Sequence, residues 1–304
     1  MELGFGIPVS GSWATPAIVR EVCQRAEQLG YVSLWSYQRT LYPADGSIPV
    51  VYRSVHDPLA ISAYVAGVTS QARIGLAVVN LPFYAPLVLA KALTTIDVLS
   101  EGRLDVGLGL GWSPDEFRAA GATMERRGAR ADEYLQALRA VWGDDPVEHS
   151  GEFYEVPRSL VQPKPVQRPG PPLLMGGTAE PSLRRAGRLA DGWISSSGFP
   201  AEKMPAALAT LRAAREEAGG SMEDFRVVVR AVVRVREEAG ERAFTGPVEK
   251  VLRDMATYAS YGVTELFVDL NFDEEIGNPE ADPAESLHRA HGALEAFTPG
   301  STSL

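Results

Sequence analysis

The chain has 304 residues, of which 45% are hydrophobic and 22% are charged, and its formal net charge is -10. This length suffices for one large domain with a full core, since an α/β barrel takes about 250 residues. The acidic balance and the scattered basic residues argue against nucleic acid as the main partner, because phosphate binding needs clustered Lys and Arg. The only cysteine, Cys23, rules out an internal disulfide framework and fits a reducing compartment.

We expect a cytoplasmic protein with no membrane attachment. The opening segment, Met1–Pro8, has no basic region followed by a long apolar run, so it does not resemble a signal peptide. The longest uncharged apolar stretch, Ile74–Ala90, is interrupted by Asn80, Pro82 and Pro86. It is also shorter than the roughly 20 residues that a spanning helix needs.

Short apolar runs alternate with helical patterns through the first half of the chain. Thr15 is a plausible N-cap before Pro16, and Gly30 ends the pattern that follows. The predicted strands are Leu3–Pro8, Val32–Ser36, Arg73–Asn80 and Leu104–Leu110. The predicted helices are Pro16–Leu29, Asp57–Thr69, Pro86–Leu99 and Asp115–Trp142, the last with a break near Gly128; Tyr37–Val55 is a long irregular segment.

The second half continues this alternation and completes eight strand-helix units. Its predicted strands are Leu173–Met175, Trp193–Ser196, Val227–Val235 and Glu265–Leu270. Its predicted helices are Pro181–Leu189, one ending at Ala218, Val248–Tyr261 and Ala284–Phe297. Eight such units predict an α/β fold of the (β/α)8 TIM-barrel type, with an open doubly wound sheet as the alternative. We expect one domain over residues 1–304, with a small insertion at about 143–172. Within this insertion, the sequence of Val147–Pro157 predicts a hairpin.

In a barrel of this kind the active site lies at the carboxyl ends of the strands. The segments expected there are Pro8–Trp13, Ser36–Gln38, Ala77–Asn80, Leu110–Trp112, Gly176–Glu180, Ser195–Gly198, Arg234–Arg236 and Asp269–Asn271. They predict an aromatic-walled site with few charges. The alternating glycines of Gly102–Trp112 indicate close approach of a flat cofactor, or else tight packing inside the barrel.

Met175–Thr178 precedes a helix, and free N–H groups at a helix start together with a hydroxyl favour a phosphate site. An ordinary glycine turn is the alternative.

Other candidate groups are weaker. His288 and His291 are three residues apart on the last helix, a pattern that favours a solvent-facing helix over a metal site, so we expect no metal. Cys23 falls on an apolar helical stripe and is expected to pack in the core. The chain has no Gly-x-Ser-x-Gly elbow for a Ser-His-Asp triad, and His56-Asp57 is favoured as a helix cap. A pocket without obvious acid, base or metal suits a redox cofactor that supplies its own chemistry.

Taken together, several stretches resemble the bacterial luciferase-like monooxygenase superfamily, and most closely its coenzyme F420 (deazaflavin)-dependent oxidoreductase branch. The resemblance covers nearly the whole chain in the right order. The matching stretches are Ala26–Trp35 (AEQLGYVSLW), Asp57–Leu59, Leu89–Arg103 (LAKALTTIDVLSEGR), Gly107–Trp112, Glu116–Phe117, Arg127–Leu135, Gly176–Thr178 and Arg184–Trp193.

The resemblance implies a flavin or deazaflavin at the carboxyl-terminal face of the barrel. Its ring would rest on a bulge with a non-prolyl cis peptide at Ala77-Val78, near Asn80. Leu110, Gly111 and Trp112 would flank the cofactor, while Gly176, Gly177 and Thr178 would hold its phosphate. Asp132, Glu133 and the arginines near them are interpreted as scaffold, and a homodimer is implied.

One position departs from the family pattern. Members of the deazaflavin branch commonly carry Asp-His after the second strand, with the histidine as proton donor, whereas this chain has Tyr37-Gln38. Gln38 can form hydrogen bonds but cannot act as a general acid. Tyr37 and Gln38 are the catalytic candidates, and another residue or water is the alternative proton source. Trp13, Tyr42 and Tyr52 are candidate substrate walls or part of a lid, with surface packing as the alternative.

The leading functional prediction is an F420-dependent oxidoreductase that exchanges hydride with a small organic substrate. The first alternative is an FMN-dependent monooxygenase, which would need a reductase partner. The second is a flavin- or deazaflavin-binding protein without turnover, and a phosphate-substrate isomerase ranks last because the strand ends lack the carboxylate or lysine that such chemistry uses.

Overall fold

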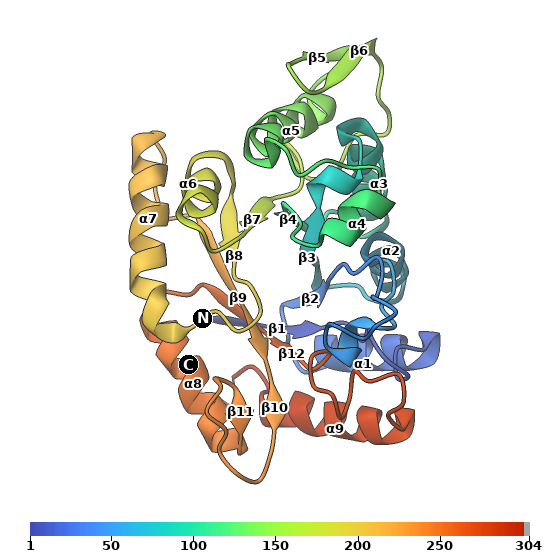
Figure 1. The fold of residues 1–304 in the computed structure, drawn as a ribbon, viewed down its shortest axis with the longest axis vertical. Coiled ribbons are helices and arrows are strands. Elements are labelled where there is room, and N and C mark those ends of the chain that lie inside the picture. Colours follow the sequence, from blue (N-terminus) through green and yellow to red (C-terminus); the bar gives the residue numbers. More distant parts are fainter. Residues whose placement is uncertain (301–304) are drawn as a thin grey trace.

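A computed structural model describes residues 1–300 of the chain as a closed barrel of eight parallel strands surrounded by helices (Figure 1). Neighbouring strands in the sheet follow chain order, and the last pairs with the first, as the (β/α)8 prediction requires. The barrel strands are β1 (Glu2–Gly6), β2 (Ser33–Ser36), β3 (Arg73–Asn80), β4 (Leu104–Gly109), β7 (Leu173–Gly176), β8 (Gly192–Ile194), β9 (Arg226–Val232) and β12 (Glu265–Asp269).

Several helices begin where capping residues and prolines predict. The side chains of Thr15, Asp57 and Asp282 accept backbone N–H groups at three helix starts, each followed by proline. The helices are α1 (Pro16–Gln28), α2 (Pro58–Val68), α3 (Pro86–Leu99), α4 (Pro114–Ala119), α5 (Arg127–Trp142), α6 (Glu180–Leu189), α7 (Met204–Glu217), α8 (Val248–Ser260) and α9 (Pro283–Ala296). None of the helices in the described part of the chain is long and apolar enough to cross a bilayer.

The predicted insertion follows α5 and contains an antiparallel hairpin of β5 (Val147–Ser150) and β6 (Glu155–Ser159), which projects at one end of the molecule (Figure 1). Its tip is held by Glu133 of α5, whose carboxylate accepts the backbone N–H groups of Glu152, Phe153 and Tyr154. Partial burial raises the pKa of Glu133, but these three donors outweigh burial and hold it below 4.5. Glu133 is therefore a scaffold residue, as expected.

Two sequence predictions of secondary structure are wrong in detail. The helix predicted over Asp115–Trp142 breaks between Ala119 and Arg127 rather than at Gly128, because Gly121 and Arg126 adopt left-handed conformations there. The strand predicted over Val227–Val235 ends at Val232. Its last residues form β10 (Arg234–Val235), which pairs with β11 (Thr245–Gly246) outside the barrel.

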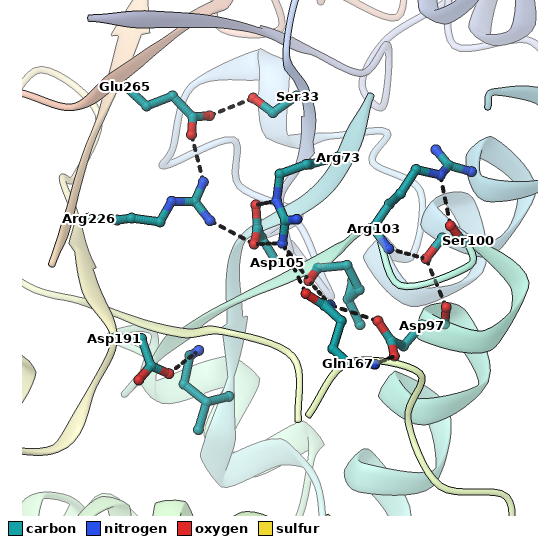
Figure 2. Close-up of polar contacts among 12 residues, drawn as sticks. Ser33, Arg73, Asp97, Ser100, Arg103, Asp105, Gln167, Asp191, Arg226 and Glu265 are labelled. Atoms are coloured by element: carbon teal, nitrogen blue, oxygen red, sulfur yellow. Dashed lines mark hydrogen bonds and ion pairs between the residues drawn. The ribbon is translucent and has the colours of Figure 1, made fainter. Parts of the chain in front are cut away.

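A charged network occupies the amino-terminal end of the barrel (Figure 2). Asp105 is fully buried and pairs with both Arg73 and Arg226, while Arg226 also contacts Glu265 at 2.6 Å. Burial raises the pKa of Glu265. The positive charge of Arg226 and the hydrogen bond from Ser33 offset part of this rise. In this fold the amino-terminal face serves stability, so we assign the network a structural role.

Aromatic side chains fill the barrel interior between this network and the opposite end. Trp35 stacks on Phe267 with ring centroids 5.3 Å apart and donates its indole N–H to Glu265 at 2.8 Å. Gly75 provides the space, because a Cβ atom there would lie 2.2 Å from the Trp35 ring. The barrel is thus a packed core that opens only at the carboxyl ends of its strands.

Candidate functional site

A cavity of about 560 Å³ lies at the carboxyl ends of the barrel strands. Twelve of the predicted site residues line it: Tyr37, Gln38, Tyr52, Ala77, Val78, Asn80, Leu110, Gly111, Trp112, Gly176, Gly177 and Thr178. They come from β2, β3, β4, β7 and the connecting segments, which the closed sheet brings to one opening.

The floor of the cavity includes a bulge in β3. The Ala77-Val78 peptide is cis, as the resemblance implies, and the pairing of β3 with β4 shifts register between Leu76 and Val79. Gly107 and Gly109 of β4 make room for this bulge. A Cβ atom on Gly107 would lie 1.9 Å from the Leu76 carbonyl oxygen, and one on Gly109 would lie 2.5 Å from a Val78 methyl. These two glycines serve close packing of main chain, which in turn shapes the cavity floor.

Gln38 holds one end of the bulge. Its Oε1 accepts the backbone N–H of Asn80 at 2.8 Å, and its Nε2 donates to the hydroxyl of Tyr84 at 2.8 Å. Both ends of the amide are therefore engaged in positioning the segment that follows β3. Since an amide has no titratable proton, this geometry suits a positioning residue.

Arg230 of β9 holds the other end. Its Nε donates to Asp269 at 2.6 Å, and its Nη1 lies 3.4 Å from the carbonyl oxygen of Ala77, directly before the cis peptide. The guanidinium lies over the rings of Tyr37 and Phe272, with its central carbon 4.5 and 4.2 Å from their centroids. The buried charge is therefore paired, stacked and fixed against the bulge.

A second buried arginine joins the irregular segment after β2 to α4. Arg39 pairs with Glu116 at 3.1 Å, and their side chains are only 4% and 2% exposed. Its guanidinium lies between the rings of Tyr52 and Trp112, 4.7 and 4.6 Å from their centroids. This stack forms one wall of the mouth and fixes Trp112, although that side chain is 59% exposed.

The loop between β7 and α6 presents unpaired donors to the cavity. The backbone N–H groups of Thr178 and Ala179 bond to no other described backbone group, and the hydroxyls of Thr178 and Ser182 likewise have no partner in residues 1–300. Gly177 is in the left-handed region at φ +118°, and a Cβ atom there would lie 2.7 Å from Ser182. The turn therefore requires glycine. Unpaired N–H groups at a helix start, with hydroxyls beside them, can donate hydrogen bonds to an anion.

Arg127 adds a positive charge to this wall. It is the first residue of α5 and donates to the carbonyl oxygen of Gly111 at 2.9 Å, with no carboxylate partner among the described residues. A cation at a helix start opposes the helix dipole, so the position favours an anion nearby. Arg127, one of the arginines near Asp132 that the sequence analysis interprets as scaffold, therefore also lines the cavity.

Two predicted substrate residues do not line the cavity. Trp13 is fully buried in the main hydrophobic core, because the segment after β1 folds inward beside the loop at Asn271 to Asn278. Tyr42 donates its hydroxyl to the carbonyl oxygen of Ile48 within its own loop. Of the three proposed wall residues, only Tyr52 reaches the cavity.

Sequence reasoning missed six residues of the lining: Arg39, Arg127, Ser182, Ile194, Arg230 and Phe272. The expectation of few charges is therefore wrong, since three arginines contribute to the wall. The signal that could have found Arg230 is an arginine inside the apolar run RVVVRAV, because such a charge must be paired. Arg127 could have been recognised as a cation at a helix start.

The wall contains few groups that titrate near neutral pH. Among the described residues, no Asp, Glu, His, Lys or Cys lines this cavity, and no cluster of three or more such residues could hold a metal ion. Burial raises the pKa of Tyr37 well above 10, and burial also raises that of Tyr52. The arrangement can orient a ligand and exclude water from it, but it offers no evident general acid or base.

The family described as luciferase-like monooxygenase matches residues 5–300, and the chain belongs to this family. An uncharacterised protein of Mycobacterium tuberculosis (strain ATCC 25618 / H37Rv) is 34% identical over 208 residues, covering 64% of this chain and 72% of the relative. An FMNH2-dependent dimethylsulfone monooxygenase of Pseudomonas putida is 30% identical over 227 residues, covering 73% of this chain and 59% of that protein.

Solved structures share the fold at low sequence identity. Monooxygenase RslO1 from Streptomyces bottropensis superposes with a TM-score of 0.79 at 22% identity, covering 99% of this chain and 100% of that one. An F420-dependent secondary alcohol dehydrogenase, solved with an F420-acetone adduct, gives a TM-score of 0.78 at 15% identity, covering 93% and 98%. The chain is thus a luciferase-like oxidoreductase or monooxygenase by family, on a TIM barrel.

Proposed function

We propose that the protein is an F420-dependent oxidoreductase that exchanges hydride between the deazaflavin and a small organic substrate. The observation that carries the proposal is the pairing, in one cavity, of the β3 bulge at Ala77-Val78 with the anion site at Thr178 to Ser182. A flat ring that bears a phosphate on a flexible arm fits these two features together. The motif resemblance to the deazaflavin branch supports F420 among such cofactors.

When bound, F420 would supply the hydride chemistry, and the side chains of this protein would supply position and exclusion of water. Gln38 and Arg230 would fix the bulge on which the ring rests. Thr178, Ser182 and Arg127 would hold the phosphate. The Arg39 stack would close one side of the mouth above the substrate.

FMN is the second candidate cofactor. The P. putida relative is FMNH2-dependent, and the family includes monooxygenases. A flavin ring and its single phosphate would occupy the same two features of the cavity. If the protein is an FMN-dependent monooxygenase, it should consume oxygen when FMNH2 is supplied, and it should need a reductase partner.

Titration of the apo protein with F420 and FMN, each in both redox states, separates these proposals. We expect saturable binding of F420, followed by a change in deazaflavin absorbance with a panel of alcohols, ketones, enones and imines. Tight FMN binding without F420 binding would replace the first proposal with the second. Binding of F420 with no hydride transfer across the panel would instead support a binding protein without turnover.

We further propose that the protein forms a homodimer through α2, α3 and the insertion. No charged residue occurs in α2, and the neighbouring surface exposes Val88 at 62%, Leu99 at 53% and Leu160 at 76%. Leu160 and Val88 also line one groove with Lys91. Light scattering should give twice the chain mass, and Val88→Asp should produce monomers; a wild-type monomer at micromolar concentration would contradict this interface.

A further inference from the structure

An aromatic wall lies across the barrel from the loop between β7 and α6. Tyr37 and Tyr52 lie in the segment after β2, and Phe272 follows β12; these two strands flank β1, which is opposite β7 in the closed sheet. The three rings line the main cavity and pack on one another with centroids 5.0 to 6.3 Å apart. Trp112 extends the wall to the rim after β4, because the Arg39 guanidinium lies between its ring and that of Tyr52.

Trp112 presents the most accessible ring of this wall. It is 59% exposed, whereas Tyr37 and Phe272 are buried. Arg39 lies over one face of the indole, 4.6 Å from its centroid, so the exposed area belongs to the opposite face and the edge. A second aromatic ring gains stability on such a face beyond the area that it buries. The indole is thus a platform for a flat group, supported from behind by Arg39 and its partner Glu116.

The charges beside the aromatic wall are balanced. Arg39 pairs with Glu116 at 3.1 Å, and Arg230 donates to Asp269 at 2.6 Å. Each arginine is neutralised by its own carboxylate, so these four side chains together carry no net charge. An ionic substrate would lose hydration at this wall without gaining an opposite charge. The wall therefore favours a neutral molecule.

We infer that the substrate is a neutral aryl enone whose flat π system stacks on the free face of Trp112. The inference rests on the proposed function, because it selects one class among the substrates to which F420 transfers hydride. A C–H bond forms at the β-carbon with the hydride that reduced F420 supplies, and the π electrons of the C=C bond move onto the carbonyl oxygen. Water then protonates the α-carbon. The substrate gains two electrons, and F420 loses two.

The wall suits an enone better than a simple ketone. Hydride addition to a ketone leaves a localised alkoxide that needs a proton at once, whereas addition to an enone leaves an enolate with a delocalised charge. Burial raises the pKa of both Tyr37 and Tyr52, so these phenols are poorer proton donors than exposed ones. A delocalised enolate can take its proton later from water.

The test measures kcat/KM with reduced F420 for three ligands of similar size. Benzylideneacetone is a flat aryl enone, its cyclohexyl analogue keeps the enone without the aromatic ring, and benzylacetone is the saturated ketone. We expect benzylideneacetone to be reduced fastest and benzylacetone slowest. Trp112→Leu should lower the ratio of kcat/KM for the aryl enone to that for the cyclohexyl enone about fivefold, within the range for an aromatic pair. Trp112→Phe, which keeps a ring face, should preserve most of this preference.

The ratio separates substrate stacking from any effect of the substitution on F420, because both enones use the same loaded protein. Calorimetry with oxidised F420 bound measures affinity without turnover, and Trp112→Leu should raise the dissociation constant of benzylideneacetone about fivefold. Tyr261→Leu is the matched control, since Tyr261 is an exposed aromatic residue at the end of α8 that does not line the cavity. It should leave the ratio and the dissociation constant unchanged.

Each contrary result has its own meaning. An unchanged ratio and an unchanged dissociation constant in Trp112→Leu, with an active wild-type protein, would overturn the stacking assignment alone. Faster reduction of benzylacetone than of benzylideneacetone would overturn the enone class. Failure of the wild-type protein to bind F420, or to transfer hydride to any alcohol, ketone, enone or imine, would overturn the proposed function and this inference with it.

Discussion

Substitution of Gly109 by alanine should impair cofactor binding while preserving the barrel. The new Cβ atom would lie 2.5 Å from a Val78 methyl and 3.2 Å from the Asn80 side-chain oxygen. Carbon atoms pack at about 3.5 to 4.0 Å, so that methyl must move by about 1 Å or more. Because Val78 lines the cavity, the displaced side chain would disturb the surface on which the ring is proposed to rest.

Overpacking of this kind costs about 1 to 3 kcal/mol, and Gly109→Ala falls at the lower end because the atom it meets first is a terminal methyl that lines the cavity. We expect a dissociation constant for F420 at least tenfold higher, which corresponds to about 1.4 kcal/mol. Urea unfolding and fluorescence titration measure the two effects. Gly292→Ala in α9 is the control, since its Cβ would meet no atom within 4 Å and helix propensity favours alanine. Unchanged F420 affinity in Gly109→Ala would refute the placement of the ring on the bulge.

Four other outcomes follow from the structure. Arg127→Gln should weaken phosphate-bearing cofactors about tenfold and spare the precursor that lacks the phosphate; equal losses would remove Arg127 from the anion site. Arg226→Met should lower the unfolding free energy by about 3 kcal/mol, because Asp105 and Glu265 would lose a buried partner. Glu133→Gln should destabilise the protein by about 1 to 2 kcal/mol at pH 7. Because the pKa of Glu133 is lowered in the fold, that difference should disappear as the pH falls below about 4.5, and a constant difference would contradict the assignment. The rate of hydride transfer should be nearly constant from pH 6 to 9, since burial raises the pKa of the cavity tyrosines Tyr37 and Tyr52 and no Asp, Glu, His, Lys or Cys lines the described wall. A titration in that range would reveal an acid or base outside the cavity.

The sequence was sufficient to predict the barrel and its insertion because periodicity and chain-breaking residues recur in each unit. Pro16, Pro58, Pro86 and Pro283 each stand at the first position of a helix, directly after a strand or loop. Such local signals do not depend on distant contacts. They locate the strand ends to within a few residues, and hence most of the cavity lining.

Contacts between distant segments decided the features that the sequence did not reveal. Trp13 and Tyr52 are both aromatic residues outside the barrel strands, yet tertiary packing buries the first and places the second at the cavity. Gly107 and Gly109 look like a cofactor floor in the sequence, but their need for glycine comes from the bulge in the neighbouring strand. Similarly, the pairing of Arg230 with Asp269 joins residues 39 positions apart.

In the proposed complex, a deazaflavin ring rests on the β3 bulge with its phosphate at the start of α6. A crystal structure of the complex with F420 tests this most directly. We expect the ring in van der Waals contact with Ala77 and Val78, and the phosphate within hydrogen-bonding distance of Thr178 and Ser182. A ring bound elsewhere, or a phosphate away from this loop, would contradict it.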